Sequence, residues 1–161
     1  GSGFLYVRPE HQDWIESTIV SWGWREPSTF VSRNEYQGTR DMAPFLATPA
    51  AIRYQQEHNW AEQRQRCHAL ALKARDRIAD LWDVPPLTPD DPGEWFSQLV
   101  TCPLPNIDVA EAKQRLYDEF QIEVPFVDWH GLKGVRVSFQ AYNDENDLDR
   151  LLEGLKAVVQ P

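Results

Sequence analysis

A short polar stretch, residues 37–41, gathers several groups that bind anions. Gly38 lets the backbone turn without a Cβ clash, and Thr39 adds a hydroxyl beside exposed amides. Arg40 supplies a planar fork that suits a phosphate or a carboxylate, and the carboxylate of Asp41 follows it. These residue types predict a site for an anionic group, although an ordinary polar turn would use the same residues.

A second candidate is Arg136, which stands in a run of alternating character. Val135, Val137 and Phe139 are apolar, whereas Arg136 and Ser138, which lie between them, are polar. Successive side chains of a strand point to opposite faces, so the apolar residues face a core and Arg136 faces away from it. The pattern predicts a guanidinium held by a rigid strand, which either binds a carboxylate or pairs with a neighbouring acid.

Other kinds of chemistry have little support. His68 neighbours Cys67, but adjacent residues of a helix point about 100° apart and no further ligand stands at metal-binding spacing, so we expect no metal site. No Walker or dinucleotide phosphate loop and no nucleophile elbow is present. Cys67 and Cys102 stand far apart and form no Cys-x-x-Cys pair. This cysteine usage is typical of a reducing compartment and predicts a cytoplasmic protein.

The composition limits the class of protein and the kinds of partner that the sequence allows. The chain has 161 residues, of which 42% are hydrophobic and 25% are charged, which suffices for one buried core. Its net charge is -9 and no basic run offsets the acids, which argues against nucleic acid and anionic membrane surfaces as partners. No apolar run approaches the roughly 18 residues of a membrane span, and we expect no membrane association.

Two parts of the sequence resemble the class V aminotransferases, a family of pyridoxal 5'-phosphate (PLP) enzymes that includes cysteine desulfurases and isopenicillin N epimerase. The first part is residues 36–41 followed by residues 44–51. The second part is residues 136–138 with residues 142–143. The sequence is most similar to the epimerase-like branch, and the resemblance covers most of the chain.

The resemblance implies roles for three residues. Arg136 would bind the α-carboxylate of an amino-acid substrate, while Thr39 and the amides beside Gly38 would reach the PLP phosphate of the other subunit in a homodimer. The family's Schiff-base lysine lies just upstream of a segment that resembles residues 1–6. We therefore expect the C-terminal portion of such an enzyme, with no catalytic residue in this chain, no PLP bound to it alone and no activity by itself.

The type of reaction stays open among transamination, epimerisation and desulfuration. A desulfurase needs a cysteine on a mobile loop, whereas Cys67 is predicted in the middle of a helix and Cys102 late in a strand, so desulfuration is disfavoured. The alternative function is a non-catalytic dimerisation or carboxylate-sensing module that uses the same sheet without cofactor chemistry.

The elements of the N-terminal half are predicted from local patterns. Residues 3–7 form a short apolar run that predicts a buried strand. Thr48 with Pro49 is a good helix start, and the periodicity predicts a long helix over residues 48–82 with a bend at residues 58–59. We assign residues 1–47 to a remnant of the large PLP-binding domain and an inter-domain segment.

The second half predicts a small domain, residues 48–161, with a proline-rich loop over 83–94 and a β-α-β-β-α order over 95–159. Its expected elements are strands within 96–104, 123–129 and 135–139, a helix from the capping box at 108–111, a hairpin loop at 130–134 and a last helix capped by Asn143. Pro125 indicates an edge position for the middle strand. The expected fold is α/β of the α+β type, a two-layer sandwich in which helices pack on a small, mainly antiparallel sheet, plus a long N-terminal helix.

Overall fold

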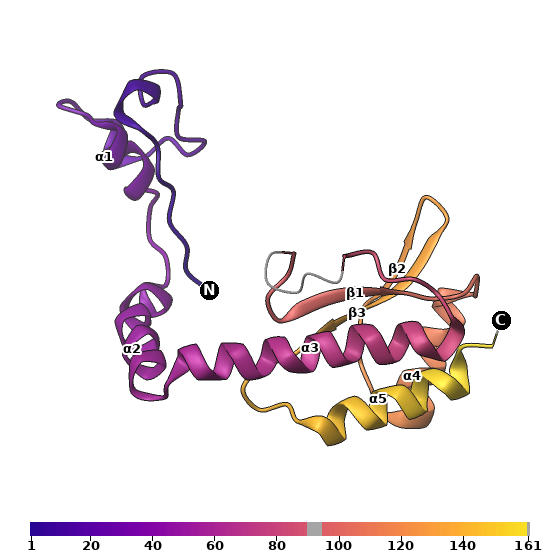
Figure 1. Cartoon of the computed structure of the whole chain (residues 1–161). Coiled ribbons are helices and arrows are strands. Elements are labelled where there is room, and N and C mark those ends of the chain that lie inside the picture. Colours follow the sequence, from indigo (N-terminus) through magenta and orange to yellow (C-terminus); the bar gives the residue numbers. More distant parts are fainter. Residues whose placement is uncertain (90–94, 161) are drawn as a thin grey trace. The chain divides into compact units, whose positions relative to one another are not determined.

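The computed structural model describes residues 1–89 and 95–160 (Figure 1). Its contacts divide the chain into two compact units, Gly1–His58 and Asn59–Pro161, which we call unit 1 and unit 2. The predicted proline-rich loop falls partly outside the described residues, at 90–94, and residues 84–89 form neither helix nor strand. The assignment of 1–47 and 48–161 to two domains of a larger enzyme remains a prediction.

Unit 2 contains the predicted antiparallel sheet, in which β1 and β2 are shorter than the sequence pattern indicated and β3 begins three residues earlier. Strands β1 (Leu99–Pro103), β3 (Leu132–Ser138) and β2 (Phe126–Trp129) lie side by side in that order. Strand β2 is therefore an edge strand, as Pro125 predicted. The hairpin loop is shorter than expected, because Trp129 already pairs with Leu132.

Three helices cover one face of this sheet (Figure 1). Helix α3 (Trp60–Trp82) contacts β1 and β3, helix α4 (Val109–Phe120) contacts β2, and helix α5 (Glu145–Val158) packs against α3 and α4. The two-layer α/β fold is thus confirmed. The core between the layers consists mainly of the apolar stripes of the helices and the inward residues of β1 and β3. Every hydrophobic side chain that is buried in the described residues belongs to unit 2.

The caps of the two C-terminal helices agree with the sequence to within one residue. The carboxylate of Asp108 accepts hydrogen bonds from the amides of Ala110 and Glu111 and so begins α4. The cap of α5 is Asp144, and the prediction of Asn143 was wrong. Asn143 instead accepts a hydrogen bond from the backbone amide of Gln140 (2.9 Å), which closes the turn after β3. Two neighbouring residues were both suitable caps, and the turn engages the first.

Unit 1 consists of short helices joined by irregular segments. Two 3-10 helices, η1 (Pro9–His11) and η2 (Trp22–Trp24), precede α1 (Phe30–Glu35) and α2 (Ala43–Glu57). The expected long helix is interrupted at residues 58–59, where Asn59 adopts a left-handed conformation with φ of 49°.

Two predictions in this unit were wrong. Helix α2 begins at Ala43 and not at Thr48, since Pro44 occupies the first turn and Thr48 donates its hydroxyl to the carbonyl of Pro44 inside the helix. The run at residues 3–7 forms no strand, and Phe4 is 96% exposed. A strand is stabilised by hydrogen bonds to a neighbouring strand, and the described part of unit 1 contains none.

Candidate functional site

Gly38 and Thr39 lie in an exposed loop between α1 and α2 (Figure 1). Gly38 has φ of 105°, a backbone conformation that favours glycine, and an added Cβ would meet no atom within 4 Å. Among the described residues, the amides of Gly38 and Thr39 and the Thr39 hydroxyl have no hydrogen-bond partner. Three donors in succession are therefore open to an external acceptor, as the predicted anion site requires.

Arg40 and Asp41, the other two residues of the predicted site, have local partners. The guanidinium of Arg40 donates to the side-chain oxygen of Gln37 (3.1 Å) and lies 4.7 Å from the ring centre of Phe45. The carboxylate of Asp41 accepts from the amide of Ala43 (2.9 Å) at the beginning of α2. The sequence pattern assigned no function to this carboxylate, and the structure shows that it binds the first amide of α2, whose N-cap residue is Met42.

Arg136 lies in β3, the central strand of the sheet, between β1 and β2. It pairs with Thr101 of β1, and its amide donates to the carbonyl of Pro125 (2.8 Å). Val135 and Val137 are 0% and 3% exposed on the helix side of the sheet, while Arg136 is exposed. The predicted alternation is confirmed, and the guanidinium belongs to the uncovered face.

The charge of Arg136 is not neutralised within the described part of the chain. Its guanidinium makes no hydrogen bond and no ion pair with any described residue. Asp128, the acid within the β2–β3 hairpin, pairs with Lys133 at 2.6 Å. The alternative of a surface arginine paired with a neighbouring acid is therefore not observed there. The role of Arg136 as a carboxylate ligand stays a prediction.

The connection from β3 to α5 is held by an arginine that the sequence analysis missed. Arg66, on α3, donates to the carbonyls of Ala141 (2.6 Å) and Asn143 (2.7 Å). These partners are 75 and 77 residues away in sequence, so no local pattern predicts the contact. Arg66 fixes the point at which the chain leaves the strand of Arg136.

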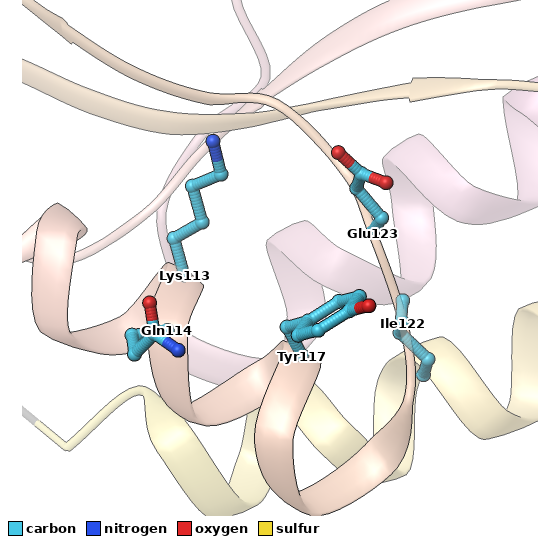
Figure 2. Close-up of a pocket in the computed structure, with 5 residues that line it drawn as sticks. All are labelled: Lys113, Gln114, Tyr117, Ile122 and Glu123. Atoms are coloured by element: carbon cyan, nitrogen blue, oxygen red, sulfur yellow. The ribbon is translucent and has the colours of Figure 1, made fainter.

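Arg136 lines neither of two hollows that described residues of unit 2 form. One of about 240 Å³ lies beside α4, and its lining includes Lys113, Tyr117 and Glu123 (Figure 2). Another of about 250 Å³ lies at the end of β3 and includes Ser138 in its lining. Gly38 and Thr39 belong to unit 1 and Arg136 to unit 2, so each candidate is an open surface of its own unit.

Both cysteines are buried and free, Cys67 in α3 and Cys102 in β1. Burial raises the pKa of the Cys102 thiol from an ordinary value of 9.0 to about 12. The described residues include no group of three or more potential metal ligands. Within the same residues, no helix combines the length and the apolar character needed to cross a membrane.

The fold itself places this chain among α/β proteins with a small antiparallel sheet covered by helices on one face. Residues 1–151 match the family described as aminotransferase class-V, and the chain belongs to that family. The resemblance inferred from residues 36–51 and 136–143 is thereby confirmed.

Two curated relatives are named isopenicillin N epimerase. The protein from Amycolatopsis lactamdurans is 34% identical over 171 residues, and the protein from Streptomyces clavuligerus is 33% identical over 173 residues. Each alignment covers 98% of this chain and 43% of the relative, so the chain spans less than half of either protein's length.

A solved structure supports the same fold. The apo structure of a cysteine desulfurase from Thermococcus onnurineus NA1 matches with a TM-score of 0.71 at 20% sequence identity. The match covers 96% of this chain and 42% of that one.

Proposed function

We propose that this chain is part of a PLP-dependent enzyme of the aminotransferase or epimerase type that acts on amino acids. Its contribution is to bind the α-carboxylate of the substrate and to supply contacts between the two subunits of a homodimer. Family membership and the two relatives named isopenicillin N epimerase support this proposal. The observation that carries it is the guanidinium of Arg136, exposed on a rigid central strand and unpaired among the described residues.

The loop of Gly38 and Thr39 fits the phosphate of PLP. Successive backbone amides and a hydroxyl without described partners are the donors that a phosphate needs. We assign these two residues to the phosphate of the cofactor bound by the partner subunit. When bound, PLP acts as an electron sink for bond cleavage at the α-carbon of an amino acid. Arg136 then orients the substrate by its carboxylate.

The lysines of this chain do not have the setting of a Schiff-base lysine. Lys73 pairs with Glu145, and Lys133 pairs with Asp128. Lys113 and Lys156 are exposed on α4 and α5. A nucleophilic lysine is usually desolvated or close to another cation. We therefore propose that the 161-residue chain alone is inactive and retains no PLP covalently.

The positions of the cysteines favour an aminotransferase or an epimerase over a desulfurase. Cys67 and Cys102 are buried within regular elements, whereas a sulfur acceptor must reach the substrate from a mobile loop. Free thiols also support our proposal of a cytoplasmic enzyme. The second candidate function, a non-catalytic carboxylate-sensing module, rests on the same open face of the sheet.

Substitution of Arg136 in the complete enzyme tests the proposal. An unpaired, desolvated substrate carboxylate costs about 2 to 5 kcal/mol, so Arg136→Ala should lower kcat/KM for amino acids by roughly thirty-fold to several thousand-fold. Arg136→Lys should recover only part of this loss, because one ammonium does not reproduce a planar contact with two bonds.

The controls separate a ligand from a structural residue. An amine substrate without a carboxylate should be nearly indifferent to Arg136→Ala. Arg64 is exposed on α3, and Arg64→Ala should leave kcat/KM unchanged. If Arg136→Ala slows the amine and the amino acid equally, Arg136 is structural and the proposed role is wrong. Carboxylate binding by a complete protein that lacks PLP and any turnover would favour the sensing module.

A further inference from the structure

Arg136 has small or uncharged neighbours on the open face of the sheet. Thr101 lies directly opposite it on β1, and the carbonyl of Pro125 receives its amide on the other side. Gly134 precedes it by two residues and Ser138 follows it by two, so both face the same side. Directly opposed residues of an antiparallel pair have Cβ atoms about 4.5 to 5.5 Å apart. Thr101 is therefore the polar side chain nearest to the base of Arg136 across the strands.

The hydroxyl of Thr101 is without a partner in the described structure. Val100 and Cys102 are buried on the helix side, so Thr101 points to the open side, where it is half-buried. Its methyl group lies toward Gly134, 3.5 Å from the position that a Cβ on Gly134 would occupy. No described residue forms a hydrogen bond with its hydroxyl. A hydroxyl without a described partner thus belongs to the residue directly opposite Arg136, on the same face of the sheet.

Gly134 is buried at the point where β1 and β3 approach each other closely. A Cβ on Gly134 would stand 3.0 Å from the carbonyl oxygen of Cys102, which is tighter than an ordinary contact. It would also meet the methyl group of Thr101 on the open face. Glycine therefore allows the two strands to approach closely beside Thr101.

The chemistry of a carboxylate requires more donors than one guanidinium supplies. A carboxylate has about four lone-pair sites, and a bidentate arginine occupies two of them. We infer that Thr101 is a second ligand of the carboxylate that Arg136 binds, donating its hydroxyl to one carboxylate oxygen. This inference rests on the proposed function. It makes the pair Thr101 and Arg136, one residue from each of two adjacent strands, the unit that recognises the substrate carboxylate.

Two variants of Thr101 separate the hydroxyl from the shape of the side chain. Thr101→Val keeps the branched outline and the methyl group beside Gly134, whereas Thr101→Ser keeps the hydroxyl and removes the methyl group. The PLP-loaded complete enzyme is titrated with L-alanine and with ethylamine, and the absorbance of the cofactor reports binding. One hydrogen bond to a charged group corresponds to a roughly tenfold or larger change in affinity. Thr101→Val should therefore weaken L-alanine binding roughly tenfold and leave ethylamine binding unchanged, while Thr101→Ser should bind both like the parent.

A second measurement needs no cofactor. The 161-residue chain is titrated with sodium acetate while the side-chain Nε–H resonance of Arg136 is followed by NMR. Thr101→Val should raise the acetate concentration at half-saturation, and Thr101→Ser should not. Unfolding of each variant in urea verifies that the sheet is intact.

The outcomes distinguish this inference from the proposed function. If Arg136→Ala weakens L-alanine selectively but Thr101→Val does not, Thr101 is no ligand and the proposed function stands. If Thr101→Val weakens ethylamine as much as L-alanine, its effect is structural and the inference is wrong. If Arg136→Ala itself shows no selectivity for the carboxylate, the proposed role of Arg136 fails together with this inference.

Discussion

Arg66 should contribute to the stability of unit 2 through its two bonds to the β3–α5 connection. The perturbation is Arg66→Met, which keeps an unbranched apolar stem on α3 but removes the donors of these two bonds and of a longer one from Nε to the side-chain oxygen of Gln63 (3.3 Å). The carbonyls of Ala141 and Asn143 then lose partners at 2.6 and 2.7 Å. Arg66→Lys retains the positive charge but presents one ammonium where the guanidinium presented two separate nitrogens.

The magnitude follows from the number of bonds and from their exposure. A hydrogen bond that involves a charged group contributes about 1.5 to 3 kcal/mol. Arg66 is only half-buried, and water can replace part of each bond, so we expect a combined loss of about 2 to 3 kcal/mol for Arg66→Met. Arg66→Lys should lose about half of that. For a unit of this size each kcal/mol corresponds to roughly 4 to 8 °C in Tm.

Urea denaturation followed by circular dichroism measures the free energy of unfolding of each variant. Arg64→Met is the matched control, because Arg64 lies two residues away on α3, is exposed and forms no hydrogen bond with a described residue. That control should change stability by less than about 0.5 kcal/mol. If Arg66→Met is as stable as Arg64→Met, or Arg66→Lys is as stable as the parent chain, the two hydrogen bonds from Arg66 to the carbonyls do not stabilise the connection.

Two other outcomes follow from the structure. Because the folded chain favours the neutral Cys102 thiol, with its pKa raised from 9.0 to about 12, this group contributes stability that is fully present below about pH 9 and is lost as the pH rises toward 12. Cys102→Ala should flatten that alkaline loss in urea titrations, and an unchanged profile would contradict it. In the complete enzyme, Thr39→Ala should weaken PLP retention by roughly 1.5 to 3 kcal/mol with Thr39→Ser as the control, measured by dialysis and cofactor absorbance. In dimers of one Thr39→Ala subunit and one parent subunit, the cofactor bound by the parent subunit should be the one that is lost. Loss confined to the mutant subunit's own cofactor would contradict the assignment.

The sequence predicted the elements in which buried apolar residues recur at a regular local spacing. The alternation around Arg136 and the leucine stripe of α5 each bury one face, so a shift of register would expose the core. Residues 3–7 have the composition of a strand, but composition supplies no neighbouring strand. Thr48 and Pro49 have the types of a helix start, yet the same pair also occurs within α2, where the hydroxyl bonds to the preceding turn.

The candidate site was predictable to the same extent. Strand alternation was sufficient to place Arg136 on the open face. The position of Thr101 opposite it depends on the register between two strands about thirty-five residues apart, which local alternation does not predict. The hydrogen bonds of Arg66 to the β3–α5 connection join residues that are even farther apart in the sequence. The roles of Gly38 and Thr39 came from the family resemblance, since the residues alone were equally compatible with a polar turn.

The confinement of the buried apolar side chains to unit 2 determines what a melting experiment on this chain reports. The heat-capacity change of unfolding arises from newly wetted apolar surface, so a calorimetric transition should scale with the roughly 100 residues of unit 2 rather than with the whole chain. Tryptophan fluorescence does not divide in this way. Trp24 in unit 1 is half-buried and donates its indole N–H to the carbonyl of Ile19 (3.1 Å), whereas Trp95 and Trp129 in unit 2 are 60% and 66% exposed. Calorimetry therefore follows the small α/β fold, while an emission shift on heating also reports on residues 1–58.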